Sequence, residues 1–446
     1  MKIDNTLVTY YAQVQSALQA LLGGEERTSA DFTPGIGLPE LTPAMREYLS
    51  VSSAAISLMP EYQGRKLSLL DLTCNPGTRT TKTFASLVMV ARAIRFIQYT
   101  GQRVTLISPS SANKATALRD AVLSAIMLGL VTAEQLNIIV VVPAASGHKL
   151  RATELATQPD LRIRNPIAVY TGSKPDAVKA LAQGMVDRHR ISLEKESSTH
   201  LWYTLRLENY LVGDVVRALV EADLHPPTPS HDRLHVHAVS SAYGLLGHAY
   251  GRELLGSHAP GRPSRYFLVQ HLGTADMVES LYAGTAEGQT PAYKLNNLTG
   301  LYEQRENLRF PTVTFDSREV LDTTFYTKAP VTSPRMNSLI HTQGGGGIVV
   351  SLAECLERYG QVRALLEPTG LHVPANPTAV LEWSLIMAMT GILNAIDRDL
   401  VPDWDILVHG SGIYSRGEFD ALSLRELHPV QDADSLRDIV AKAATA

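Results

Sequence analysis

The sequence predicts an α/β protein in which parallel or mostly parallel sheets are covered by helices. Short runs rich in Val, Ile, Leu and aromatic residues alternate with longer stretches that repeat apolar residues every three or four positions. The short runs predict strands at 67–73, 103–108, 137–142, 166–172, 200–205, 234–240, 265–270 and 404–410. The longer stretches predict helices at 5–22, 83–98, 113–129, 174–188, 207–222, 244–255, 351–367 and 378–396.

Composition places the chain among large globular proteins. It has 446 residues, of which 45% are hydrophobic and 19% charged, so it can bury a substantial core in more than one domain. Lys and Arg total 40 against 44 for Asp and Glu, and this net charge of −4 argues against nucleic acid as a partner. Cys74 and Cys355 are the only cysteines, which excludes a disulfide scaffold and predicts a cytoplasmic location. The longest apolar run, 138–145, is too short to cross a membrane.

Proline-rich breaks indicate how the chain is organised. The segments 224–233 and 257–264 combine several prolines with small and polar residues, a pattern typical of linkers and long loops. We expect a domain edge at the first of them. Residues 1–90 then begin a large domain, residues 91–224 form a smaller α/β domain, and residues 225–446 complete the large one.

A predicted strand, a Gly- and Thr-rich turn and a predicted helix meet around Lys82. Gly77, Lys82 and Thr83 nearly match the phosphate-binding P-loop, but the glycine required before the lysine is absent. A second interpretation is a covalent one, because a lysine partly buried at a helix start loses its proton more easily and can form a Schiff base. A surface lysine after a polar turn is the third.

A second polar turn follows one strand later and opens an amphipathic helix. Its residues are Ser110, Ser111, Ala112 and Asn113. Hydroxyl groups, backbone N–H groups and the positive end of the helix dipole can together bind a carboxylate at such a turn. The alternative is an ordinary helix N-cap.

These two motifs, in this order, resemble the fold-type II enzymes that depend on pyridoxal 5′-phosphate. That family includes threonine synthase, cysteine synthase, serine racemase and the β subunit of tryptophan synthase. Its N-P-[TS]-G-S-x-K-x-R motif is similar to residues 75–83, with one residue inserted. Its S-[ST]-G-N loop is similar to residues 110–113, with alanine in place of glycine.

The resemblance implies a two-domain, tryptophan synthase β-like architecture and a role for each matching residue. Lys82 would carry the cofactor as a Schiff base, and Asn113 would contact the cofactor's 3′-oxygen. Ser110, Ser111 and Ala112 would hold the substrate carboxylate.

The resemblance also implies a phosphate-binding loop between a strand and a helix. The residues in that place are Ser240, Ser241, Ala242, Tyr243 and Gly244. Relatives carry several glycines there, whereas this loop has one. The rival is the glycine run 344–347, but a strand-like segment follows it and would present no helix N-terminus to the phosphate, so we favour 240–244.

Near the C-terminus, residues 407–412 resemble the family's [ST]-G-x-G segment, whose hydroxyl meets the pyridine nitrogen of the cofactor. Strict alignment places His409 in that position, with Ser411 two residues later. A hydroxyl leaves the ring nitrogen largely unprotonated, whereas an imidazolium could donate to it. The sequence leaves open whether His409 or Ser411 meets the pyridine nitrogen. His235 and His237 share a strand face that two metal ligands could use, but no third ligand is evident, and we expect no metal.

The implied function is pyridoxal-phosphate-dependent chemistry on a small amino-acid substrate. The expected reaction is β-elimination or β-replacement through an aminoacrylate, with Lys82 also moving the α-proton. Threonine-synthase-like γ chemistry is the alternative within the family, and a non-catalytic or nucleotide-binding α/β protein is the alternative outside it. A homodimer is expected. The sequence identifies neither the amino acid nor the leaving group and nucleophile.

Overall fold

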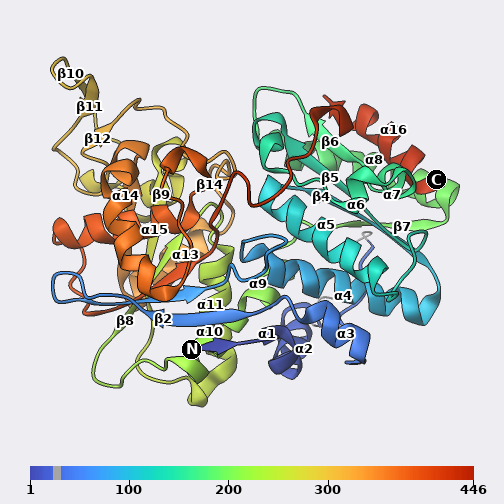
Figure 1. Ribbon diagram of the computed structural model, residues 1–446, viewed down its shortest axis with the longest axis horizontal. Coiled ribbons are helices and arrows are strands. Elements are labelled where there is room, and N and C mark those ends of the chain that lie inside the picture. Colours follow the sequence, from blue (N-terminus) through green and yellow to red (C-terminus); the bar gives the residue numbers. More distant parts are fainter. Residues whose placement is uncertain (24–31) are drawn as a thin grey trace. The chain divides into compact units, whose positions relative to one another are not determined.

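The chain folds as two units, each built around its own sheet (Figure 1). The computed structural model describes residues 1–23 and 32–446. The first unit consists of residues 1–3, 53–74 and 215–416, and the second of residues 4–52, 75–214 and 417–446. The sequence placed the domain edges at other positions, near 90 and 224, and expected the C-terminal residues in the large domain.

The first unit contains a seven-stranded sheet of order β1-β2-β3-β15-β8-β9-β13. Its strands are β1 (Lys2–Ile3), β2 (Ala54–Leu58), β3 (Lys66–Asp71), β8 (Arg233–Ala238), β9 (Arg265–His271), β13 (Gly345–Val350) and β15 (Asp405–Gly410). Strands β3, β15, β8, β9 and β13 are parallel, and β1 and β2 form an antiparallel edge. Smaller sheets join β10 (Lys294–Asn296), β11 (Leu301–Glu303) and β12 (Val313–Thr314), and β14 (Val380–Glu382) with β16 (Tyr414–Ser415).

Helices cover both faces of this sheet. They are α10 (Val216–Leu224), α11 (Tyr243–Leu255), α12 (Asp276–Leu281), α13 (Ser333–Gln343), α14 (Leu352–Leu366) and α15 (Ser384–Asp397). The chain moves from β8 to β9 to β13 in one direction and returns through α14 and α15 to β15 in the other. Because crossovers between parallel strands are right-handed, the helices of the return lie on the opposite face from α11. Helix α15 accordingly packs across β15, β8, β9 and β13.

Strand alternation gives the two faces of this sheet different chemistry. Leu234, Val236, Ile406 and Val408 point toward α15 and belong to one apolar core. The residues between them point to the other face, where α10 and α11 lie. The buried polar side chains on that face include His235, His237 and His409.

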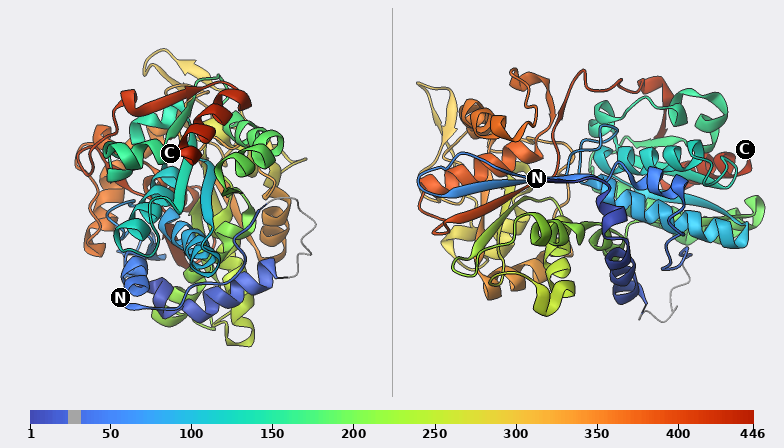
Figure 2. Two further views of the ribbon diagram at one scale, coloured as in Figure 1. Left: turned by 90° about the vertical axis from the view of Figure 1, so that its right-hand side faces the viewer. Right: turned by 60° about the horizontal axis from the view of Figure 1, so that its bottom comes forward.

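The second unit contains a five-stranded sheet of order β17-β6-β5-β4-β7, all parallel. Its strands are β4 (Arg103–Pro109), β5 (Leu136–Pro143), β6 (Ile167–Tyr170), β7 (Thr199–Tyr203) and β17 (Leu427–Val430). Its helices are α1 (Thr6–Thr9), α2 (Tyr11–Leu22), α3 (Pro43–Leu49), α4 (Lys82–Thr100), α5 (Ala112–Met127), α6 (Glu154–Thr157), α7 (Pro159–Arg164), α8 (Ala177–Ser197), α9 (Leu207–Asp214) and α16 (Ala433–Thr445). Figure 2 shows the red C-terminal helix α16 beside the green α8, against which it packs.

The predicted strands are confirmed, with ends that shift by a few residues. The predicted helix 207–222 is divided into α9 and α10. The helix predicted from residue 378 begins only at Ser384, because Val380 and Glu382 pair with β16. Among the described residues, none of the helices combines the length and hydropathy needed to traverse a bilayer.

Candidate functional site

Lys82 is the first residue of α4 and is half-buried. The turn before it is organised by Asn75, whose Oδ1 accepts a hydrogen bond from the Gly77 amide at 2.9 Å. Asn75 Nδ2 donates to Oδ2 of Asp120 at 3.1 Å and to Oγ1 of Thr83 at 3.2 Å. A Cβ on Gly77 would lie 2.5 Å from Oδ1 of Asp120, so any larger residue would push this carboxylate of α5 aside. The turn is therefore tied to both helices that flank it.

Arg151 holds the same turn from another side. Its guanidinium donates to the carbonyl oxygens of Pro76 at 2.9 Å and Thr78 at 3.0 Å. Arg79 adopts a left-handed φ of 54°, which is uncommon for a residue other than glycine. Such a conformation persists where surrounding contacts impose it, and here both hydrogen bonds hold the residues directly before Arg79. The turn thus gives Lys82 a fixed starting point.

The predicted carboxylate loop lies at the start of α5. Ser111 is the N-cap residue, in an extended conformation and with no capping hydrogen bond from its side chain. Ser110 is buried, and its hydroxyl donates to the Ser111 carbonyl oxygen. Ala112 and Asn113 are the first two helical residues and are also buried. Because α4 and α5 pack against each other, the structure places this loop and Lys82 at the starts of neighbouring helices.

The predicted phosphate loop lies at the start of α11, in the first unit. Ala242 is the N-cap residue with φ 51°, and its side chain makes no capping hydrogen bond. A Cβ on Gly244 would lie 2.6 Å from Nη2 of Arg217, so the buried guanidinium contacts the backbone of this loop. Arg217 was not among the predicted site residues. The rival glycine run enters β13, where a Cβ on Gly345 would lie 1.8 Å from the Tyr266 carbonyl oxygen.

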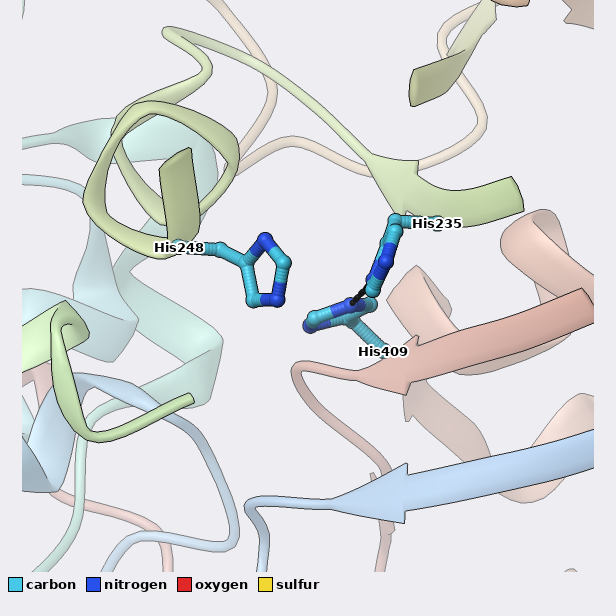
Figure 3. Close-up of side chains that lie close together, drawn as sticks. All are labelled: His235, His248 and His409. Atoms are coloured by element: carbon cyan, nitrogen blue, oxygen red, sulfur yellow. Dashed lines mark hydrogen bonds between the residues drawn. The ribbon is translucent and has the colours of Figure 1, made fainter. Parts of the chain in front are cut away.

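Buried histidines surround Arg217 on one face of the first sheet. His235 and His409 come from β8 and β15, which pair with His235 opposite Leu407, so both imidazoles point to the same side. His248 reaches them from α11 (Figure 3). The three side chains are essentially inaccessible to solvent. Each offers a nitrogen within 4.8 Å of the others, a spacing that could hold a metal ion.

The hydrogen bonds of the cluster argue against a metal ion. Arginine can only donate, so His409 accepts at Nδ1 from Nη1 of Arg217, at 3.2 Å, and carries its proton on Nε2. That proton is donated to Nδ1 of His235 at 3.1 Å, which leaves His235 protonated on Nε2, 3.6 Å from a carboxylate oxygen of Glu221. Each neutral imidazole has one lone pair, and both of these lone pairs are occupied.

His248 is bound in the same way. Its Nε2 donates to Glu221 at 2.8 Å, and its Nδ1 accepts from the hydroxyl of Tyr266 at 2.9 Å. Arg233 donates to the other oxygen of Glu221 at 3.0 Å. Hydrogen bonds run from Arg217 through His409 to His235, and from Tyr266 through His248 to Glu221, so that the described side chains leave no lone pair of these three imidazoles for a metal.

The charges of this network follow from burial. Desolvation alone would raise the pKa of Glu221, but His235, His248 and Arg233 hold it well below its usual range, so Glu221 is an anion. Burial lowers the pKa values of His235, His237 and His409 well below the ordinary histidine value, and that of His248 less strongly, so these imidazoles are neutral. The imidazolium considered for His409 from the sequence is therefore not favoured.

Some of these residues had a signal in the sequence. Arg217 and Glu221 lie four residues apart on α10, so they share one face of a mainly apolar helix. His248 and Asp120 had none, because each is one polar residue on an amphipathic helix. Ser411 lies directly after β15, partly exposed. In the first unit, Arg217 contacts both the predicted phosphate loop and His409. In the second unit, the turn before Lys82 contacts α5.

Comparison with known families matches almost the whole chain. Residues 2–444 match the model of DUF6002, a family of unknown function. The chain belongs to this family. None of the curated proteins matches it significantly.

Two solved structures have the same fold. The threonine synthase of Escherichia coli is 14% identical, with a TM-score of 0.55 over 95% of this chain and 96% of that one. The pyridoxal-phosphate-bound threonine synthase of Brucella melitensis is 11% identical, with a TM-score of 0.54 over 97% and 89%. These similarities confirm the predicted fold class, a fold-type II α/β architecture.

Proposed function

We propose that this protein is a pyridoxal-phosphate-dependent enzyme that acts on an amino acid, with Lys82 as the residue that carries the cofactor. The observation that carries the proposal is the placement of Lys82 and of residues 110–113 at the starts of the packed helices α4 and α5, within a fold shared with threonine synthases.

The donor groups fit the cofactor's functional groups. Lys82 provides an amine at the end of a rigid turn. The loop 240–244 provides the uncapped N-terminus of a 13-residue helix, with the Arg217 guanidinium against Gly244, and this combination suits a phosphate. Tyr243, which is bulkier than the residues of relatives, lies half-buried in the first turn of the helix.

Each residue then has a chemical task. Lys82 Nζ would attach the cofactor covalently and would afterwards take the α-proton of the substrate. Backbone N–H groups at the start of α5 and the hydroxyls of Ser110 and Ser111 would bind the substrate carboxylate, and Asn113 would orient the cofactor. When bound, the cofactor supplies an electron sink for the substrate's α-carbon.

The network around His409 bears on the ring-nitrogen contact. Both nitrogens of His409 are engaged, with Arg217 and with His235. Ser411, by contrast, follows the strand end and is partly exposed. This supports Ser411 as the group that meets the pyridine nitrogen, and it gives His409 the task of orienting Arg217.

β-Elimination or β-replacement is the reaction we propose. Because both structures described above are threonine synthases, γ chemistry stays the alternative. A panel of amino acids with β- or γ-leaving groups, followed by absorbance and product analysis, separates the two reactions.

The test of the proposal is the site of covalent attachment. The protein is incubated with pyridoxal phosphate, reduced with borohydride and digested, and the peptides are mapped by mass spectrometry. The pyridoxyl group is expected on Lys82 and is expected to vanish in Lys82→Ala. Attachment to Lys114 would contradict the assignment, and absence of any visible absorbance would favour a non-catalytic protein on this scaffold.

A further inference from the structure

A buried lysine follows the predicted carboxylate loop directly. Lys114 is the third residue of α5 and is only 7% exposed. Its Nζ donates to the carbonyl oxygen of Pro109 at 3.1 Å and lies 4.8 Å from the centre of the Tyr210 ring. Within the part of the chain that the structure describes, no carboxylate pairs with it. Lys114 is thus a buried amine without an acidic partner.

The surroundings of Lys114 favour its neutral form. Burying an ammonium group without a counter-ion is costly, and a lysine so placed releases its proton instead. The charges that act on Lys114 are the ammonium groups of Lys82 on α4 and Lys179 on α8, which repel a positive charge on Lys114. The ring of Tyr210 on α9 also faces Lys114. Burial first, and these two charges second, lower its pKa well below the ordinary lysine value. As a neutral amine, Lys114 can donate to Pro109 and keep its lone pair.

A carboxylate at the start of α5 would change this balance. Nζ is hydrogen-bonded to the residue that directly precedes Ser110, so an anion bound by residues 110–113 would sit close to it. A nearby negative charge favours the protonated amine and opposes the repulsion from Lys82 and Lys179. Binding of a carboxylate would therefore turn Lys114 into a stronger base.

We propose that Lys114 takes the proton from the α-ammonium group of the amino-acid substrate. The substrate ammonium becomes a neutral amine and Lys114 becomes an ammonium group, so charge and protons balance without a further reactant. The free substrate amine then has the lone pair it needs to displace Lys82. This inference rests on the proposed function, since it assumes an amino acid bound by its carboxylate at residues 110–113.

The test measures protons rather than turnover. Propionate has the carboxylate of an amino acid but no ammonium group, so its binding should draw a proton from solution onto Lys114. L-Alanine brings its own proton and should draw none. Isothermal titration calorimetry of the holoenzyme at pH 8.0, in two buffers of different ionisation enthalpy, gives the number of protons taken up. We expect uptake approaching about one proton per chain with propionate and about none with L-alanine.

Variants locate the proton. Lys114→Met, which keeps an apolar side chain of similar length, should abolish the uptake with propionate, and Lys174→Met, at an exposed lysine of the same unit, should leave it unchanged. Should Lys114→Met fail to fold, Lys114→Gln serves instead. Its amide can still donate to Pro109 but cannot take up a proton, so the uptake with propionate should vanish as well.

The outcomes separate this inference from the proposed function. No uptake by the wild-type protein, or equal uptake by Lys114→Met, overturns the role of Lys114 even if borohydride mapping finds the cofactor on Lys82. Uptake that depends on Lys114 supports it. If mapping then finds no cofactor on Lys82, the carboxylate-coupled proton site stands and the proposed enzyme does not.

Discussion

Nη1 of Arg217 donates to Nδ1 of His409 across 3.2 Å, and this one contact sets the proton positions of a buried network. An arginine side chain has no lone pair to offer, so the His409 proton must be on Nε2, where His235 accepts it. The negative end of the network is Glu221.

The stability of the protein should fall in mild acid. His235, His237, His248 and His409 are neutral when folded because burial lowers their pKa values, whereas the unfolded chain protonates them below about 6.5. The unfolded state therefore binds more protons, and the free energy of unfolding should decrease as pH falls from about 6.5 to 5, by up to about 1.4 kcal/mol per pH unit for each histidine.

Urea unfolding at several pH values measures this slope. His225, His271 and His428 also have lowered pKa values and add to it, while Glu221 contributes only below about 4.3, where the unfolded carboxylate is protonated. His409→Asn should reduce the slope by at most one proton. A free energy of unfolding that is unchanged between pH 7.5 and 5 would contradict neutral histidines in this cluster.

Replacing Glu221 by glutamine should destabilise the fold strongly. The carboxylate accepts from His248 and Arg233 and faces His235, all of them buried, so its loss removes the negative charge among these donors and leaves Asp405 as the partner of Arg233. Breaking a buried charged pair from one side costs about 3–5 kcal/mol. Denaturant unfolding checks this value against Glu367→Gln, an exposed position where a change within about 0.5 kcal/mol is expected. Equal effects at the two positions would contradict the importance of the network.

Gly244→Ala tests the contact between the predicted phosphate loop and Arg217. The new Cβ would lie 2.6 Å from Nη2, so the buried guanidinium must move, at a cost of about 1–3 kcal/mol. If the loop binds phosphate, the variant should also lose pyridoxal phosphate faster during dialysis. Gly360→Ala in α14 meets no atom within 4 Å and should be neutral or stabilising by about 0.5–1 kcal/mol.

Gly345 is unsuitable as the comparison, although it belongs to the rival glycine run. Its φ is 125°, and a Cβ there would lie 1.8 Å from the Tyr266 carbonyl oxygen, so Gly345→Ala should disrupt the edge of the sheet whatever the loop binds. Cofactor retention that is unaffected by Gly244→Ala would remove the support for residues 240–244 as the phosphate site.

Arg151→Met should loosen the turn that leads to Lys82. The substitution removes two hydrogen bonds, to Pro76 and Thr78, and should cost about 1–3 kcal/mol of stability. Hydrogen exchange followed by mass spectrometry should show faster exchange in peptides covering 75–83 than in the core of β5. Unchanged exchange there would mean that Asn75 and Asp120 hold the turn without Arg151.

The two candidates for the ring-nitrogen contact predict different pH profiles. If Ser411 makes the contact, Ser411→Ala should shift the absorption maximum of the bound cofactor, while the activity of the wild-type protein shows no ionisation assignable to His409, whose pKa burial lowers well below the histidine range. If His409 makes it, His409→Ser should shift the pH profile and Ser411→Ala should not. Absence of an effect from either change would remove residues 407–412 from the cofactor site.

The secondary structure of this protein could be read largely from its sequence. Strand and helix periods depend on neighbouring residues, so β8, β15, α4 and α5 lie where the apolar patterns predict them. The sequence also places Lys82 and residues 110–113 at helix starts. At each of them the apolar repeat of a strand gives way to that of a helix. Strand β17, with only four residues, was not predicted, and neither was the amphipathic helix α16 that follows it.

The tertiary structure alone decided which buried polar groups meet. His235 and His409 are brought together by the register of β8 on β15, whose residues are about 170 positions apart, and nothing local sets that register. The same holds for β17, which joins β6 from the far end of the chain. Local sequence determined where each histidine and lysine lies along its own element. Whether His409 is neutral, and whether Lys114 lacks an acidic partner, depends on burial by distant segments, which only the packed fold provides.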